Sequence, residues 1–428
     1  IKLWSIGKRY GYVTQIQFFR NRFESNGLGY LLFPILVLLV IPYLLIGVIW
    51  AAKTIVGITV EKVTPKGTIP GTFPEFFEST NGAVPPWLTG AVICIVVLCY
   101  IFAGGSRAAA WANTFQTIVF MVMGVLAFYL ISSKLGGLAA AIEQANAAHL
   151  VRTPSELEYM AKGKEVTREV GIPPLMFATY MFIPLSVGMF PHLFQHWLTA
   201  KSAKAFKLTV VAHPLCIMIV WVPCVLIGLW ATGKLPENAP PAAVLAQMVG
   251  RLVQDPVIVG LVTAGVLAAI MSSLDSQFLC LGTIFTNDIV LHNSKKKRSD
   301  EQILFMARAF VVSIVVLTYI LAMLLIDQNV FDLAVWCFSG FAALTPLVIA
   351  ALYWRRATKA GAYASVLATT ITWFIFFAMS GFGGEYTVPG TGGVMPVAVC
   401  WLAGAAAMVL VSLVTKPPSE ETVAKFFH

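Results

Sequence analysis

An acid and several hydroxyl groups stand inside one apolar stretch of the sequence, GVLAAIMSSLDSQFLCLGTIFTNDI at residues 265–289. The acid is Asp275, and the nearest hydroxyls are those of Ser272, Ser273 and Ser276. A hard cation such as sodium needs several oxygen ligands, and paired hydroxyls with backbone carbonyls supply them without burial of a full charge. A carboxylate at membrane depth is itself a functional candidate, because it faces the bundle interior or a wet cavity. A cation site is therefore one interpretation of this stretch.

Helical spacing gathers small and hydroxyl residues into a stripe along one face of the same segment. Ser273 lies at one edge of this stripe, and Asp275 lies beyond the other edge. Such a stripe also lets membrane helices pack closely, and its hydroxyls can bond back to their own helix. From the spacing alone packing is the simpler interpretation, and Asp275 keeps the cation site open. The stripe consists of Gly265, Ala269, Ser272, Ser276 and Thr283.

The composition requires elements that cross a lipid bilayer. Hydrophobic residues make up 58% of the 428 residues and charged residues 11%, and the mean hydropathy is +0.81. These values exclude a soluble fold with a polar surface and indicate an integral membrane protein. The seven cysteines all fall in apolar runs without metal-ligand spacing, so we expect free, buried thiols.

The apolar segments are long enough to cross the membrane, at about 20 residues each. A Gly-Gly-Ser-Arg turn at Gly104–Arg107 divides the second from the third and predicts a tight helical hairpin. Ten spans are predicted, at residues 30–57, 88–106, 109–133, 174–198, 208–233, 256–287, 303–326, 330–354, 360–380 and 394–415.

Basic residues concentrate in the first segment and in every second loop after it, which is typical of cytoplasmic loops. Acids such as Glu24 and Asp288 are fewer in these loops. We therefore expect a multi-pass protein of the plasma (inner) membrane with both termini, the C-terminus included, in the cytoplasm. The net charge of +9 suits the anionic inner leaflet, so the lipid bilayer and not nucleic acid is the expected partner. The basic residues are Lys2, Lys8, Arg9, Arg20, Arg22, Arg107, Lys201, Lys204, Lys207, Lys295, Lys296, Lys297, Arg298, Arg355, Arg356, Lys359, Lys416 and Lys425.

Four blocks of the sequence resemble the sodium:solute symporter family, which includes sodium-coupled proline, pantothenate and glucose carriers. The run LAAIMSSLDSQFL at residues 267–279, continuing into TIFTNDI, resembles the signature helix of that family. The other blocks are YIFAGGSRAAAWANTFQ (100–116), GMFPHLFQHWLTAKSAKAF (188–206) and FSGFAALTPLVIAALYWRRATKAGA (338–362). They follow in family order and at family spacing, and together they span nearly all of the chain.

The resemblance implies an all-α membrane fold of two five-helix inverted repeats and sodium-driven symport of a small organic solute by alternating access. Sodium is the implied coupling ion, and no organic cofactor is implied. The backbone carbonyl of Ala269 and the hydroxyls of Ser272 and Ser273 match the ligands of the principal sodium ion. Ser186 falls near the gate region of the substrate pocket, and the solute itself is left open.

A second cation site is known in some family members, built from an acid on the fifth core helix and hydroxyls of the signature helix. The place of that acid falls on Asn113 here, whereas Asp275 stands where a serine is common and Ser276 keeps a hydroxyl. One hypothesis is that the charge has moved across the helix pair and still serves a cation or proton. The other is that Asp275 only bonds a neighbouring helix, Asn113 included.

The resemblance also predicts how one transmembrane domain, residues 1–428, is organised. Residues 1–29 form a cytoplasmic amphipathic loop, 30–173 the remainder of the first repeat, 174–354 the second repeat, and 355–428 additional C-terminal helices with a short tail. Since the chain opens on Ile1 in a segment that matches a later loop of the family, we expect N-terminal helices, including the first two core helices, to precede it. We also expect this chain alone not to transport.

Two other functions compete with symport. A membrane sensor built on a symporter-like domain without net transport is the alternative, but the tail after Lys416 is too short for a signalling module. An enzyme is not expected, because no acid dyad, HExxH motif or nucleophile with a nearby histidine lies at membrane depth. His192 and His196 have i, i+4 spacing without an accompanying acid or cysteine, which favours packing or pocket lining over a metal site.

Overall fold

The computed structural model describes residues 1–60, 62–64, 67–69, 71–150, 172–236, 239, 241–293, 298–384 and 387–427. Apart from one antiparallel hairpin of two short strands, the elements in this part of the chain are helical. The elements are α1 (Lys2–Tyr10), α2 (Gln15–Arg22), α3 (Asn26–Thr59), β1 (Lys62–Thr64), β2 (Gly67–Ile69), η1 (Glu78–Thr80), α4 (Pro86–Lys134), α5 (Leu138–Leu150), α7 (Pro174–Tyr180), η2 (Ile183–Gly188), α8 (Pro191–Thr199), α9 (Lys204–Ala231), η3 (Pro241–Ala243), α10 (Val244–Leu252), α11 (Pro256–Ile284), η4 (Phe285–Leu291), α12 (Asp300–Leu324), α13 (Val330–Ala343), α14 (Thr345–Tyr353), α15 (Lys359–Met379), α16 (Pro396–Val414) and α17 (Glu420–Phe427).

The predicted spans are confirmed as helices. Within the described residues, nine helices are long and apolar enough to cross a membrane, or ten if α7–η2 and α8 form one bent span. The predicted division near residue 105 is also confirmed, because α4 breaks into Pro86–Gly105 and Arg107–Lys134. Gly105 has φ 57° and ψ −155°, a conformation that side chains with a Cβ rarely adopt.

Two of the spans are interrupted. The segment from α7 through η2 bends by 50° before α8, where Pro191 begins the second half. The span from Val330 to Tyr353 breaks between α13 and α14, where Pro346 follows at the first turn. At each interruption a proline stands in the first turn of the second half, where its missing backbone N–H needs no intrahelical acceptor. Such breaks leave backbone polar groups available inside a transporter.

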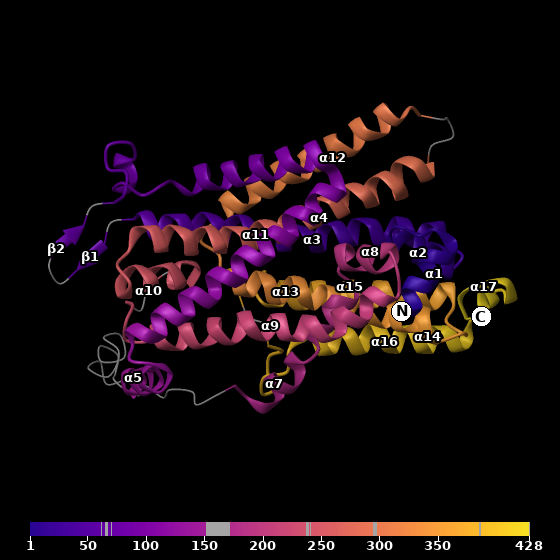
Figure 1. Cartoon of the computed structure of the whole chain (residues 1–428). Helices are drawn as coiled ribbons and strands as arrows, with labels where there is room; N and C mark the ends of the chain where they lie inside the picture. The colour runs from indigo at the N-terminus through magenta and orange to yellow at the C-terminus, as the bar shows by residue number, and fades with distance from the viewer. Residues whose placement is uncertain are drawn as a thin grey trace.

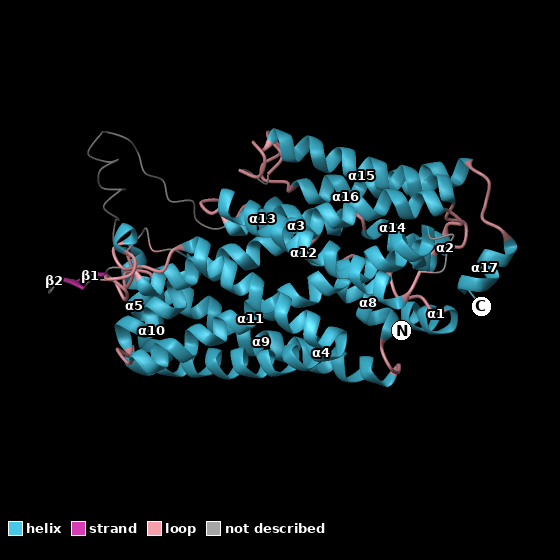
Figure 2. Cartoon of the chain, turned by 90° about the horizontal axis from the view of Figure 1, so that it is seen from above, coloured by secondary structure: helices cyan, strands magenta, loops and turns pink. Residues whose placement is uncertain are grey.

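The bundle is elongated, and its two ends differ (Figure 1). One end carries both termini with α1, α2, α14 and α17, and the opposite end carries β1, β2, α5 and α10 (Figures 1 and 2). The termini therefore lie on the same side, as predicted from the basic loops. Lys295, Lys296 and Lys297 of the predicted loops lie outside the described residues.

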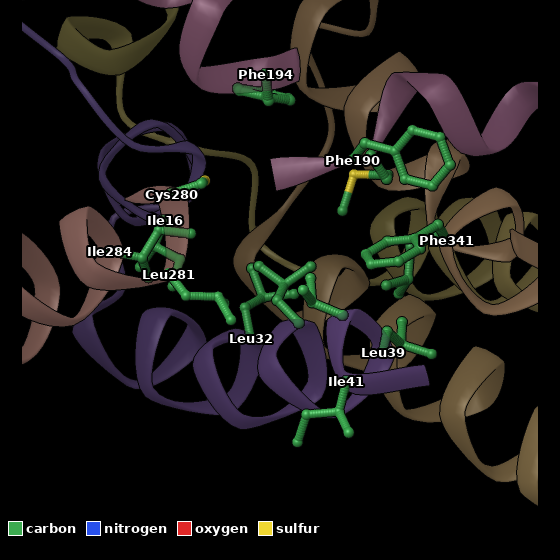
Figure 3. Packing of buried hydrophobic residues seen from close by; sticks show 14 of the residues in the cluster. Ile16, Leu32, Leu39, Ile41, Phe190, Phe194, Cys280, Leu281, Ile284 and Phe341 are labelled. Atoms are coloured by element: carbon green, nitrogen blue, oxygen red, sulfur yellow. The ribbon is translucent and has the colours of Figure 1, made fainter. Parts of the chain in front are cut away.

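The core forms around α3, which packs against α2, α4, α11, α12 and α13 among other elements (Figure 3). The segment predicted as an amphipathic loop, residues 1–29, contributes two helices to this core. Ile16, Phe18 and Phe19 of α2 have no exposed surface. The two arginines of this short helix are buried as well, so α2 does not present a basic face to solvent.

Candidate functional site

Helix α11 positions the predicted cation ligands. It begins at Asp255, whose carboxylate accepts from the backbone N–H groups of Val257 and Ile258 at 2.8 and 3.3 Å, and Pro256 follows at the first position. The helix packs closely on α4 and α3. At Gly265, an added Cβ would lie 2.7 Å from the Cβ of Met123 on α4, so only glycine permits this approach. Gly265, the first residue of the small-residue stripe, thus allows α11 to pack closely on α4.

Two turns later a serine of the stripe forms a hydrogen bond within its own helix. The hydroxyl of Ser272 donates to the carbonyl oxygen of Ala269 at 2.9 Å. Ser272 is half-buried, and Ser273 beside it is exposed. The oxygens of two of the three predicted sodium ligands, Ala269 and Ser272, therefore lie within hydrogen-bond distance of each other. A hydroxyl that bonds back to its own helix can rotate and present its lone pairs to a cation.

The second predicted group is assembled across two helices. Asn113 of α4 and Ser276 of α11 are joined by a hydrogen bond of 2.8 Å between the amide and the hydroxyl Oγ. With the amide nitrogen turned toward α11, it donates to both carboxylate oxygens of Asp275 at 3.0 Å and to the carbonyl of Ser272 at 3.1 Å, while the amide oxygen accepts from Ser276. This orientation satisfies donors and acceptors on both sides.

Asp275 is fully buried, with 0% of its surface exposed. Its hydrogen-bond partners are neutral, the Asn113 amide and the Ser276 hydroxyl at 3.4 Å, and the phenol of Tyr100 lies nearby without a hydrogen-bond partner among the described residues. Among the residues that the structure describes, no Lys, Arg or His forms an ion pair with it. A buried carboxylate without a fixed counter-charge is costly, so it either holds a proton or attracts a cation.

Two further residues belong to this group and were not singled out from the sequence. Tyr100 lies beside the Asp275 carboxylate, and the Gln116 side chain lies 3.2 Å from the Asn113 amide. They are the first and last residues of the block YIFAGGSRAAAWANTFQ. Gln116 follows Asn113 by three residues on one helix face, which was a usable signal. Tyr100 precedes the break at Gly105, so its approach depends on how the hairpin folds.

Ser186 lies in a separate part of the fold. It is buried in η2, and its carbonyl accepts from the N–H groups of Met189 and Phe190 at 2.9 and 3.1 Å, where the span bends. The element η2 packs on α13. Ser186 therefore belongs to the interrupted span and not to the polar group on α11.

An aromatic cluster surrounds the start of α8, just after this bend. The ring of Phe190 stacks on that of His192 at 5.6 Å and packs against Phe338 and Phe341. Tyr43 of α3 closes the cluster at 5.4 Å from Phe190. His196, one turn after His192, is exposed. The two imidazoles thus differ in their surroundings, and His192 packs among aromatic rings.

Known proteins share the sequence pattern and the fold of this chain. The model of the sodium:solute symporter family matches residues 85–369, more than half of the chain. The osmoregulated proline transporter OpuE of Bacillus subtilis is 24% identical over 362 residues, which is 82% of this chain and 68% of the relative. The sodium/proline symporter of Escherichia coli is 24% identical over 368 residues, 82% of this chain and 67% of the relative.

The high-affinity proline transporter PutP of Bacillus subtilis is 26% identical over 294 residues, covering 66% of this chain and 58% of the relative. A solved structure of a Na+-coupled sialic acid symporter in a substrate-bound, outward-open state matches with a TM-score of 0.69 at 14% identity. It covers 97% of this chain and 80% of that one, and it confirms the predicted inverted-repeat transporter fold. The chain is a multi-pass membrane protein that belongs to the sodium:solute symporter family, a family of sodium-coupled transporters and not of enzymes.

Proposed function

We propose that this chain works in the sodium-coupled symport of a small organic solute by alternating access. The observation that carries the proposal is the Ala269–Ser272–Ser273 group, in which a carbonyl and a hydroxyl oxygen lie 2.9 Å apart beside an exposed second hydroxyl. Oxygens so close together can share one hard cation once the hydrogen bond between them is released. Membership of a family of sodium-coupled transporters supports sodium as that cation.

Sodium binding is tested on the purified chain by thermal unfolding in detergent. The chain is titrated with sodium chloride against choline chloride at constant ionic strength. A ligand that binds the folded state alone raises stability in proportion to the logarithm of its concentration above the dissociation constant. We expect sodium to raise the melting temperature and choline not to. Equal curves in the two salts would refute sodium binding by these residues.

The Asp275 group is proposed as a second cation site. The carboxylate, the Asn113 amide oxygen or nitrogen, and the Ser276 hydroxyl form a compact polar group in the bundle. It is the neutral character of Asp275's partners that supports binding of a sodium ion or a proton. The competing hypothesis, a structural contact between α4 and α11, uses the same hydrogen bonds. The Asp275→Asn variant described in the Discussion separates the two.

The solute is proposed to bind near the interrupted span. The bend between η2 and α8 frees backbone groups, and Ser186 with the aromatic cluster around Phe190 lies beside it. The relatives carry proline, and the structural neighbour carries sialic acid, so the fold accepts solutes of different size. Our proposal stops at a small organic solute.

Transport is tested with the protein as its gene encodes it, reconstituted in lipid vesicles. An inward sodium gradient is applied, and uptake is measured for a panel that includes proline, other amino acids, a sialic acid, sugars and vitamins. Uptake of at least one solute that collapses when the gradient is removed supports the proposal. Sodium-dependent stabilisation without uptake of any solute would favour the alternative, a sensor. We also propose that the end with both termini faces the cytoplasm, which accessibility of a C-terminal tag in intact cells will check.

A further inference from the structure

The helix that carries the cation group ends in a second buried carboxylate, at the end of the molecule that holds both termini. Asp288 lies in η4, a π-helical turn that continues α11, and has 0% of its surface exposed. The prediction that Asp288 is one of the acids of a cytoplasmic surface loop is therefore wrong. π-Helical turns widen the helix by one residue per turn, and here the turn directs Asp288 into the core.

Asp288 is held by the N-terminal segment. The Thr14 hydroxyl donates to its Oδ2 at 2.6 Å. The Arg20 guanidinium forms an ion pair with Oδ1 at 3.6 Å, and its Nη2 donates to the Asp288 carbonyl at 3.3 Å. The Arg20 side chain is only 8% exposed, so the pair is removed from water on both sides. One segment therefore grips the side chain and the backbone of the last turn of α11.

The contact between Arg20 and Asp288 leaves two polar atoms unsatisfied, which favours its opening. Oδ1 of Asp288 and Nε of Arg20 are buried without a hydrogen-bond partner in the structure. A buried pair gains its attraction against the cost of lost hydration, and unsatisfied atoms increase that cost. When water enters, both groups recover hydration, which offsets much of the lost attraction. A contact with this balance can open and close without a large change in free energy.

The same segment also holds the ends of the two interrupted spans. Phe18 and Phe19 of α2 pack against Phe194 of α8 at 5.7 and 5.8 Å. The indole of Trp4 donates to the Ala200 carbonyl, just after α8, at 2.8 Å. Gly7 of α1 lies so close to Leu198 that an added Cβ would stand 2.7 Å from it. The second half of the bent span is thus fixed to α1 and α2.

The end of the other interrupted span is fixed by a buried arginine. Arg22 has no exposed surface, and its Nε and Nη2 donate to the carbonyls of Ala351 and Trp354 at 2.9 Å each. These carbonyls end α14, where a helix terminus leaves acceptors without intrahelical donors. Residues 1–23, which we call the N-terminal clasp, therefore hold together the last turns of α8, α11 with η4, and α14.

Water is close to the pair. A cavity of about 800 Å³ lies between the clasp, η4 and α17, and its lining includes Arg20, Tyr12, Asn287, His292 and Lys425. Arg20 thus contacts Asp288 on one side and the cavity on the other. A small displacement of the clasp would admit solvent to the pair. Figure 1 shows α1, α2 and α17 gathered at this end of the bundle.

We propose that the Arg20–Asp288 pair is the latch of the N-terminal clasp, and that its rupture lets the clasp leave α11 and opens this end of the transporter. Asp288 is a positioning residue: it binds no solute, and it joins the helix of the cation group to the gate. Ser272 lies on the same helix, roughly 24 Å away at 1.5 Å per residue. The role of this latch in gating rests on the proposed transport function. Whether the pair holds the clasp closed can be tested without sodium or solute.

The test uses a native thiol under the clasp. Cys280 is buried on α11 in the cluster that contains Ile16 of the clasp (Figure 3). Cys280 is kept as the single thiol and the other six cysteines are replaced by alanine, and its modification by a small membrane-permeant maleimide is timed. Asp288→Asn removes the charge with little change in shape and should raise the rate about tenfold, because local opening sets the rate of modification of a buried group.

Two controls keep the result specific. A parallel background keeps Cys400 of α16 alone, which is buried outside the clasp, and its rate should stay unchanged in Asp288→Asn. Asp300→Asn removes the same charge from an exposed acid at the start of α12 and should leave Cys280 protected. If Asp288→Asn does not fold, Arg20→Lys retains the charge but shifts the donor, and it should raise the Cys280 rate to a smaller extent.

The outcomes are distinct. An unchanged Cys280 rate in the folded Asp288→Asn or Arg20→Lys variant overturns the latch. A parallel rise at Cys400 also overturns it, because the pair would then support the whole fold and not one gate. Loss of sodium-dependent stabilisation or of uptake, with Cys280 labelling as expected, refutes the proposed function and leaves the latch standing.

Discussion

Two carboxylates on one helix, Asp275 and Asp288, are equally buried and differently partnered. Both have 0% of their surface exposed. Asp275 is surrounded by neutral groups, an amide, a hydroxyl and a phenol. Asp288 faces a guanidinium and a hydroxyl of the N-terminal clasp. A charge without a fixed partner is available to a mobile cation, whereas a charge with one is available to hold two elements together.

The different partners of the two carboxylates should have their largest effect on the free energy of unfolding. Replacing Arg20 with leucine leaves Asp288 buried without its counter-charge, and we expect a loss of about 3–5 kcal/mol of unfolding free energy. Thermal and denaturant unfolding in detergent measure it. The double variant Arg20→Leu, Asp288→Leu removes both charges and should recover most of the loss. If the single and double variants lose the same amount, packing of the Arg20 stem and not the charge accounts for the effect.

The sodium ligands provide the second measurement. Ser272→Ala removes one oxygen from the group around Ala269, and we expect the sodium concentration needed for half-maximal stabilisation to rise about tenfold or more, a loss of 1–3 kcal/mol for one partner of a charged group. The matched control is Thr263→Val on the same helix, whose hydroxyl bonds back to Val259 at 2.7 Å. Equal shifts in both variants would show that loss of a helical hydroxyl, and not of a ligand, is responsible.

The third measurement concerns Asp275 itself. Asp275→Asn keeps the shape and removes a buried charge that has no fixed counter-charge, so the unfolding free energy should not fall. The dependence of stabilisation or uptake on sodium should nevertheless weaken by roughly tenfold, because the charge that attracts the cation is gone. Unchanged sodium dependence removes the functional hypothesis and leaves Asp275 as a contact between α4 and α11.

The exposed acid Glu24 should have the smallest effect on stability of the acids compared. Burial raises the pKa of Glu24, but hydrogen bonds from Ser419 and Thr422 outweigh it and lower that pKa overall. A carboxyl whose folded-state pKa is depressed contributes stability above its unfolded pKa and loses it as the pH falls through the folded one. Since Glu24 is exposed, the effect stays below about 1 kcal/mol.

Protonation of Glu24 should weaken only the attachment of the C-terminal helix α17. Limited proteolysis in the segment just before α17 should become faster as the pH falls below about 4, the ordinary range of a glutamate. Glu24→Gln should show the faster cleavage at neutral pH and lose the pH dependence. Cleavage that depends on pH equally in both proteins would assign the effect to another acid.

The pattern of the sequence accounted for the spans because each depends on local composition. The break at Gly105, the ten apolar segments and the juxtaposition of Asn113 with Ser276 all follow from turn residues, hydropathy and helical spacing read together with the family resemblance. The roles of Ala269, Ser272 and Ser273 as sodium ligands stay predictions.

The placement of Asp288 could not be predicted in the same way. The acid follows a hydrophobic helix and precedes a basic run, which is also the pattern of an ordinary membrane-surface loop. Its burial depends on a π-helical turn and on Arg20, which is 268 positions earlier in the chain. No local period connects residues so far apart.

The sequence by itself determined that the chain crosses the membrane repeatedly, that it turns at Gly104–Arg107, and which hydroxyls share a helix face, since these properties depend on neighbours within a few turns. Only the tertiary structure decided which of the two buried carboxylates has a charged partner. That choice depends on which distant segment packs against each end of α11, and packing between distant segments is fixed by the shape and burial of the whole bundle.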